Sequence, residues 1–366
     1  GPIADIPRSE DYQTLDNGVL DAYLDRAEAL LLPGPRDVQA VYTAMHGVGG
    51  EVFMRAATAA GFPAPIPVAA QFAPDGRFPT VPFPNPEEPG AMDLALAQAK
   101  ETGADIIIAN DPDADRSSAG IPTPDGGYRM LTGDEVGSLL GWWVVERMRR
   151  RGEPMQGALA ESIVSGTLLG RIAADAGLGY ATTLTGFKWI SRVPGLVFGY
   201  EEALGYCVDP THVRDKDGVT ASLLMMEMAA HLKAEGRGIQ DVLDDLARKF
   251  GLHKTAQVSV RVSDIGLIAD AMARLRAHPP SELGGRRVLA FDDLEQGVDG
   301  LPPTDGLRFT MEDARVIIRP SGTEPKLKCY LQVVVPVDGD LSAARAKADE
   351  EMAALKASVK AAVGLG

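Results

Sequence analysis

The sequence predicts an α/β protein made of two mixed-sheet α/β domains followed by a smaller α+β C-terminal domain with an antiparallel sheet. Short apolar segments alternate with amphipathic ones through the first 250 or so residues, as in strands and helices layered on a sheet. Residues 105–109 are almost wholly apolar, which is typical of a strand buried on both faces. Residues 257–262 alternate apolar and polar side chains instead, which indicates a strand with one solvated face.

The predicted elements follow in chain order. Helices are expected where an amphipathic segment is followed by Gly or Pro. The predicted helix at 133–151 ends in arginines followed by Gly152, and both features are typical of a helix C-terminus. The predicted helices span 17–32, 51–60, 91–102, 133–151, 167–176, 219–234 and 264–277, with a further Ala/Lys-rich helix at the end. The predicted strands span 38–45, 105–109, 158–164, 179–183, 196–200, 257–262 and 288–291, with one more on each side of 319–325.

This pattern divides the chain into four parts. Residues 1–35 are interpreted as an irregular lead-in. One α/β domain is expected over 36–153, a second over 154–253 and a C-terminal α+β domain over 254–366.

The net charge, the lengths of the apolar runs and the cysteine count limit the classes of binding partner and the cellular setting that we expect. The net charge of -15 argues against nonspecific nucleic-acid binding and against docking on an anionic membrane, because both need basic patches. No apolar run approaches the roughly 20 residues that span a bilayer. The two cysteines, Cys207 and Cys329, form no disulfide framework or metal-site spacing, so we expect a reducing compartment and a cytoplasmic protein.

Three aspartates follow the apolar strand at 105–109. Asp111, Asp113 and Asp115 alternate with other residues and Arg116 comes next, so three carboxylates can converge on one hard cation such as Mg²⁺ or Ca²⁺. A solvated acidic turn is the alternative, although ligands commonly bind at the carboxyl ends of α/β strands. An EF-hand is excluded because its sixth and twelfth positions, Gly and Glu, are Arg116 and Pro122 here.

A second motif, R-P-S-G-T-E-P-K over 319–326, has the composition of a phosphate-binding turn. Arg319 offers a guanidinium, Ser321 and Thr323 offer hydroxyls, and Gly322 leaves the backbone N–H groups accessible. A polar hairpin turn would explain the Ser-Gly-Thr part, but it explains the arginine and the prolines less well.

Two further segments carry candidate residues. Glu201 and Glu202 follow the predicted strand at 196–200 and could accept hydrogen bonds from vicinal sugar hydroxyls, or could lie in a solvated turn. Lys188 stands in a T-G-F-K loop, and many such lysines are merely exposed.

The order of these motifs, D-x-D-x-D-R, T-G-F-K, G-x-E-E and R-x-S-G-T-E-P, resembles the α-D-phosphohexomutase superfamily. The resemblance covers essentially the whole chain as that family's second, third and fourth domains. It implies that 36–153 is a metal-binding domain, 154–253 a sugar-recognition domain and 254–366 a C-terminal phosphate-binding domain, with 1–35 a lead-in from a missing first domain. It implies a phosphosugar substrate, one Mg²⁺ per chain, a sugar bisphosphate activator, and a monomer or dimer. It also implies roles for the motif residues: Asp111, Asp113 and Asp115 hold the metal, Arg116 clamps the transferred phosphoryl group, Lys188 acts as acid or base, Glu201 and Glu202 orient the sugar, and Arg319, Ser321, Gly322 and Thr323 bind the distal phosphate.

Two departures from the family pattern matter. Ala203 stands where hexose-specific members usually carry serine, and 139–144 and 198–217 look most like the branch with phosphopentomutase, type-2 phosphoglucomutase and glucose-1,6-bisphosphate synthase. The family's T-x-S-H-N-P nucleophile loop is absent, because no histidine of the sequence follows a serine; Ser117 and Ser118 do not fit that pattern.

We therefore expect the greater part of a mutase whose phosphoserine segment lies upstream, and no activity from this chain alone. Such an enzyme moves a phosphoryl group between the C1 and C5 or C6 hydroxyls of a sugar phosphate through a bisphosphate intermediate. Two alternatives remain: a non-catalytic short form that binds sugar phosphates, and a metal-dependent phosphatase that uses Asp111 as its nucleophile.

Overall fold

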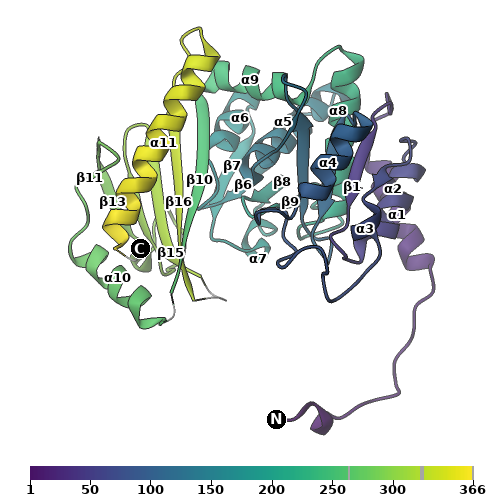
Figure 1. The fold of residues 1–366 in the computed structure, drawn as a ribbon, viewed down its shortest axis with the longest axis horizontal. Helices are drawn as coiled ribbons and strands as arrows, with labels where there is room; N and C mark the ends of the chain where they lie inside the picture. Colours follow the sequence, from purple (N-terminus) through teal and green to yellow (C-terminus); the bar gives the residue numbers. More distant parts are fainter. Residues whose placement is uncertain (263, 322–324, 365–366) are drawn as a thin grey trace.

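The fold contains three main sheets, each with its own helices (Figure 1). The computed structural model describes residues 1–262, 264–321 and 325–364. A short 3₁₀ turn, η1 (Ile3–Asp5), lies in an extended N-terminal segment that leads to α1 (Gly18–Leu30). The fold class predicted from the sequence is confirmed, with two mixed sheets followed by an antiparallel one.

The first sheet has the strand order β2-β1-β3-β4-β5. Its central strands β1 and β3 are parallel and β4 and β5 are antiparallel additions. All five residues of β3 are fully buried, as its apolar sequence predicts. The elements are β1 (Ala40–Thr43), α2 (Gly49–Ala59), β2 (Ile66–Pro67), α3 (Ala69–Phe72), α4 (Asp93–Thr102), β3 (Ile106–Asn110), β4 (Ser117–Pro122) and β5 (Tyr128–Met130).

The second sheet has the order β7-β6-β8-β9. It is also mixed, because β7, β6 and β8 are parallel and β9 runs antiparallel to β8. Its first helix, α5, has the predicted bounds; a capping box of Thr132 and Glu135 starts it, and Gly152 in the left-handed region ends it. The elements are α5 (Gly133–Arg151), β6 (Ala158–Ser162), α6 (Leu168–Ala176), β7 (Gly179–Thr183), α7 (Phe187–Ile190), β8 (Leu196–Glu201), β9 (Gly205–Cys207), α8 (Gly218–Ala234) and α9 (Ile239–Phe250).

The third sheet is antiparallel throughout, in the order β10-β16-β15-β14-β13. Strand β10 begins at Leu252, five residues before the predicted strand, because its non-alternating first half pairs with the end of β16. The elements are β10 (Leu252–Arg261), α10 (Gly266–Ala277), β11 (Glu282–Leu283), β12 (Arg286–Arg287), β13 (Ala290–Asp293), η2 (Leu294–Gln296), β14 (Leu307–Thr310), β15 (Ala314–Pro320), β16 (Lys326–Val335) and α11 (Leu341–Val363).

The first two sheets share one hydrophobic core, whereas the third has its own. Helix α5 packs against β8 of the second sheet, and α8 packs against β3 and β4 of the first, so α8 crosses back to the sheet that precedes it in sequence. The division of the chain at 153 and 253 stays a prediction. In Figure 1 the third sheet, with α10 and α11, lies to one side of the other two.

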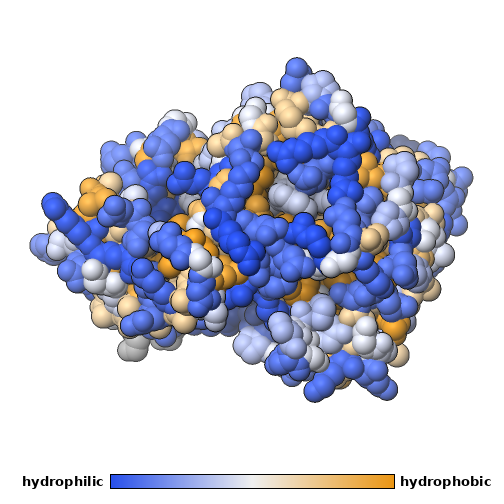
Figure 2. Space-filling view, turned by 90° about the horizontal axis from the view of Figure 1, so that it is seen from above, coloured by the Kyte–Doolittle hydropathy of each residue, from blue (hydrophilic) through white to orange (hydrophobic). Residues whose placement is uncertain are grey.

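The face of the molecule drawn in Figure 2 agrees with the polar composition of the sequence. Figure 2 shows a mainly hydrophilic face on which hydrophobic residues appear in limited patches. Among the described residues, no helix combines the length and the apolar character needed to cross a membrane.

A buried carboxylate joins α5 to α8. Glu227 on α8 is fully buried, and its Oε2 accepts a hydrogen bond from Trp143 Nε1 at 2.7 Å and lies 3.1 Å from Arg147 Nε. Its Oε1 accepts the backbone N–H of Leu32, just after α1. The carboxylate of Glu227 and the guanidinium of Arg147 are thus both buried away from water, and each charge is neutralised by the other.

Replacing Glu227 should therefore destabilise the shared core strongly. We expect Glu227→Ala to lower the free energy of unfolding by about 3–5 kcal/mol, since it leaves Arg147 buried without its partner. The matched control is Glu146→Ala, which removes an exposed i,i+3 pair with Arg149 and should cost under about 0.5 kcal/mol. Urea unfolding followed by circular dichroism checks this, and equal losses in the two variants would contradict it.

Candidate active site

The three aspartates predicted to bind a metal lie together in the loop after β3. One carboxylate oxygen from each of Asp111, Asp113 and Asp115 falls within 4.8 Å of the other two. Asp111 is buried, Asp115 is partly buried and Asp113 is exposed, so the group opens to solvent on one side. All the donors are hard oxygens, and this set fits Mg²⁺ with water or phosphate completing its coordination.

Close backbone contacts fix the path of this loop. A Cβ at Gly47 would lie 2.3 Å from the Cα of Pro112, and a Cβ at Gly218 would lie 2.2 Å from the backbone oxygen of Arg116. The loop is thus held between the turn before α2 and the first residue of α8, where no side chain fits. Ala114 has a positive φ of 59°, which turns the chain between the second and third aspartates.

The electrostatics of the loop favour a bound cation. Burial raises the pKa of Asp111 to about 6, and the charges of Asp113 and Asp115 add to this shift. The backbone N–H of Arg116, 3.0 Å from Asp111 Oδ1, and the Arg116 guanidinium act in the opposite direction. A divalent cation would remove the mutual repulsion of the three carboxylates.

Lys216 is a site residue that the sequence analysis missed. Its Nζ lies 2.6 Å from Oδ2 of Asp115, and it also lies 6.0 Å from the ring centroid of Phe187. The neighbouring Asp217 caps α8 and accepts hydrogen bonds from the N–H groups of Val219 and Thr220 at 3.0 and 3.2 Å. The sequence does not show that this helix begins against the loop of residues 111–116, called the metal loop below.

Glu201 lies where cations from three segments meet. Burial raises its pKa, and its hydrogen bond with the N–H of Gly186 and the charges of Lys216, Arg116 and Arg319 lower it. Charges from the loop of 111–116, the segment before α8 and the end of β15 therefore act on one carboxylate at the end of β8.

Glu202 turns towards its own sheet instead. Its Oε2 accepts hydrogen bonds from the hydroxyls of Ser162 and Ser165, both at 3.1 Å. Burial raises its pKa to about 7, and the charges of Asp134 and Glu201 contribute. Hydrogen bonds from the end of β6 and the residues just after it therefore hold the Glu202 side chain in place.

The predicted phosphate segment reaches across to the second sheet. Arg319 Nη1 lies 2.5 Å from the hydroxyl oxygen of Thr185 in the T-G-F-K loop. Ser321 follows at the end of β15, and its backbone N–H donates to the carbonyl of Lys326 at 2.9 Å. Gly322 and Thr323 lie outside the described residues.

Lys188, the predicted acid or base, lies apart from these contacts. It is exposed on the short helix α7, with its Nζ 5.9 Å from the ring centroid of Trp189. Ser117 and Ser118 are buried in β4, and the hydroxyl oxygens of Ser117 and Ser222 are 2.8 Å apart. Neither serine is accessible as a phosphate acceptor.

Comparison with known proteins places this site in a family. Residues 21–123, 132–250 and 258–355 match, in order, alpha/beta/alpha domain II, alpha/beta/alpha domain III and the C-terminal domain of phosphoglucomutase/phosphomannomutase. The chain belongs to this family. The superfamily resemblance that the motifs indicate is therefore confirmed.

Individual proteins similar in sequence to this chain carry different mutase names. A probable phosphomannomutase of Haemophilus influenzae is 46% identical over 332 residues, covering 90% of this chain and 67% of the relative. A phosphopentomutase of Mus musculus is 34% identical over 329 residues, covering 82% of this chain and 53% of the relative. This chain of the phosphoglucomutase/phosphomannomutase family thus spans about half to two thirds of these proteins.

A solved structure shows the same fold. The phosphoglucomutase/phosphomannomutase family protein of Burkholderia thailandensis superposes with a TM-score of 0.63 at 20% identity, over 93% of this chain and 64% of that one.

The metal loop yields a binding prediction. Asp113→Asn should weaken Mg²⁺ binding by at least about tenfold, or ~1.4 kcal/mol, because it removes one of three converging carboxylates. Asp25→Asn, an exposed change on α1, is the control and should leave binding unchanged. Isothermal titration calorimetry measures both affinities, and equal binding by the two variants would refute the metal site.

The same experiment has a pH dependence with a defined sign. Because the pKa of Asp111 is raised to about 6, a proton competes with the metal below that pH. Mg²⁺ affinity should therefore fall as the pH drops from 7.5 to 5.5, and an unchanged affinity would contradict the role of Asp111.

Proposed function

We propose that this chain supplies the metal-binding, sugar-binding and phosphate-binding parts of a phosphosugar mutase. The reaction moves a phosphoryl group between the C1 and C5 or C6 hydroxyls of a sugar phosphate, through a bisphosphate intermediate and a phosphoserine. The observation that carries this proposal is the clustered carboxylates of Asp111, Asp113 and Asp115, with Lys216 Nζ at 2.6 Å from Asp115. The charges of Lys216, Arg116 and Arg319 also act together on Glu201.

The metal loop serves the transferred phosphoryl group. Asp111, Asp113 and Asp115 hold Mg²⁺, which when bound supplies charge neutralisation for that group. Arg116 directs its guanidinium to the same place, since its Nε lies 3.6 Å from Asp111 and 3.8 Å from Asp115. This loop is suited to stabilising negative charge on phosphate.

Proton transfer at the sugar hydroxyl is assigned to a lysine. Lys188 is the residue that the family resemblance suggests, and Lys216 is a second candidate because its amine already lies at the metal loop. If Lys216 transfers the proton, Lys216→Met will lower kcat far more than Lys188→Met in the mutase.

Glu201 and Glu202 orient the sugar, and Arg319, with Ser321, Gly322 and Thr323, binds the distal phosphate. These groups come from separate domains, so a substrate bridges them. The C-terminal domain then closes about a hinge at 251–255, where Gly251 has a φ of 88°.

A phosphosugar substrate is supported by the names of the relatives, which include phosphomannomutase and phosphopentomutase. We favour the pentomutase-like branch because Ala203 replaces the usual serine of hexose-specific members. A sugar bisphosphate acts as activator. Cys207 and Cys329 are free and buried, which supports a reducing, cytoplasmic setting, and we expect a monomer or dimer.

Turnover requires the phosphoserine loop, so we expect no mutase activity from the 366-residue chain alone. The assay uses glucose, mannose or ribose 1-phosphate with Mg²⁺ and a bisphosphate activator. Robust turnover would overturn this proposal, and mass spectrometry for a phosphopeptide would then identify the acceptor. Release of inorganic phosphate without isomerisation would instead support a phosphatase, and binding by a natural protein of this length without turnover would support a non-catalytic short form.

Substrate binding separates the roles of two loops. Arg319→Ala should weaken binding of glucose, mannose and ribose phosphates alike, by roughly 10- to 150-fold, because it removes a charge-assisted hydrogen bond of about 1.5–3 kcal/mol. Glu201→Gln should change the order of affinity among the three, because it alters what the sugar hydroxyls meet. Calorimetric titrations with both variants measure this, and the opposite pattern would reverse the two assignments.

A further inference from the structure

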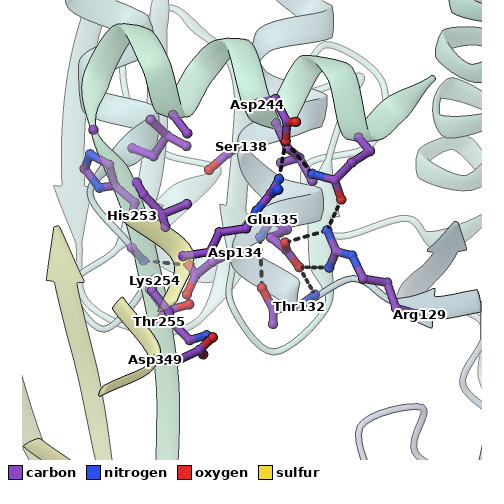
Figure 3. A pocket seen from close by; sticks show the side chains of 18 residues that line it. Arg129, Thr132, Asp134, Glu135, Ser138, Asp244, His253, Lys254, Thr255 and Asp349 are labelled. Atoms are coloured by element: carbon purple, nitrogen blue, oxygen red, sulfur yellow. Dashed lines mark hydrogen bonds and ion pairs between the residues drawn. The ribbon is translucent and has the colours of Figure 1, made fainter. Parts of the chain in front are cut away.

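A cavity of about 340 Å³ lies between α5, α9, β10 and α11, and no candidate active-site residue lines it (Figure 3). Its walls come from both sides of the junction between the shared core and the C-terminal domain. Leu168, Leu243, Ala247 and Leu252 supply an apolar part. The cavity is large enough for a small organic molecule.

The charges of the acidic and basic side chains that line the cavity almost cancel. Each of its three cations has an acidic partner: Arg129 with Glu135, Arg345 with Asp244, and Lys254 with Asp349. A fourth acid, Asp134, has no ion-pair partner among the described residues. The lining therefore carries one carboxylate in excess, which disfavours anionic ligands such as phosphosugars.

Asp134 accepts its hydrogen bonds from neutral donors. Its Oδ1 accepts the backbone N–H of Gly166 at 2.6 Å and the hydroxyl of Tyr200 at 2.9 Å. Burial raises its pKa, and these donors, the hydroxyl of Thr255 and the charge of Arg315 lower it. A positive charge bound directly beside it would further favour the ionised form.

Ser138 carries a polar group that the fold does not use. Its side chain is only 2% exposed and lines the cavity, and within the described chain its hydroxyl has no hydrogen-bond partner. The hydroxyl oxygen itself is not fully buried, so it opens into the cavity, where a ligand can hydrogen-bond to it. Ser138 is four residues after Asp134 on α5, so both lie on one helix face.

We propose that this cavity binds a small organic cation, a primary amine with an apolar body. The ammonium donates hydrogen bonds to the carboxylate of Asp134 and the hydroxyl of Ser138. The body of the molecule packs against Leu168, Leu243 and Leu252. The proposal does not rest on the mutase function and concerns a separate site, although residues 251–255, the proposed hinge, line this cavity.

Three probes of nearly equal size and different charge test this: benzylamine, benzyl alcohol and benzoate. NMR titration of the isotope-labelled 366-residue chain gives each affinity and the amides that respond. We expect benzylamine to bind with a Kd of about millimolar order, the scale for a ligand of so few atoms, and to shift the amides of 134–138 and 243–247. Benzyl alcohol should bind more weakly and benzoate weakest.

Two variants locate the ammonium. Asp134→Asn should weaken benzylamine at least about tenfold, through loss of a charge-assisted bond. Ser138→Ala should weaken it about two- to tenfold while the protein stays folded, since the hydroxyl makes no bond in the fold. Ser281→Ala, a change of an exposed serine just before β11, is the matched control and should leave the affinity unchanged.

Each outcome decides the proposal. The expected order of probes, with losses in Asp134→Asn and Ser138→Ala only, supports it. Equal affinity for amine and alcohol, or stronger binding of benzoate, overturns the charge assignment. Benzylamine binding that is the same in wild type and Ser138→Ala, or amide shifts confined to the metal loop, overturns the site even if Asp134→Asn fails to fold.

Discussion

The buried ion pair between Glu227 and Arg147 is the constraint on which the arrangement of the site depends. It joins α8, which packs on the first sheet, to α5, which packs on the second. An unpaired charge in this core would cost several kcal/mol, so the two helices are held in one relative position. The carboxyl ends of β3 and β8, with Asp111 just beyond the first and Glu201 at the end of the second, are thereby fixed with respect to each other.

The same helix carries a functional group at its other end. Helix α8 starts at Gly218, which packs directly on the backbone of the metal loop, and Asp217 caps it. Lys216 immediately precedes the cap and is therefore delivered to Asp115. Core packing, helix capping and the position of one site cation are consequences of a single helix.

The C-terminal domain contacts the shared core by a few polar bonds and a small apolar cluster. Arg319 donates to Thr185, Arg315 to the backbone oxygen of Ser165, and Gln332 to Thr167 at 2.6 Å. The apolar cluster is formed by Ile163, Val164, Leu294, Ile317 and Tyr330. An interface of this kind is more polar than a domain core and is compatible with the domain closure proposed above.

The sequence by itself determined the fold class, most long helices and the metal loop, because each depends on local information. Periodicity indicates α5, and the capping residue Asp217 lies just before α8. Alternate aspartates after an apolar strand can converge, and in the structure they do. It did not reveal α9, the short helices α3 and α7, or the short strands β2, β4, β5, β9, β11, β12 and β14. Those strands have two to six residues and exist because longer strands or neighbouring helices lie beside them.

Only the tertiary structure decided which distant residues meet. Lys216 belongs to the site because α8 crosses back to the first sheet, and Glu202 is tied to Ser162 and Ser165 because β6 lies beside β8. The cavity beside Asp134 and Ser138 likewise forms between elements more than 100 residues apart. Such contacts depend on how helices and sheets pack. The apolar pattern of a single sequence indicates which residues are buried, but not which residues they contact.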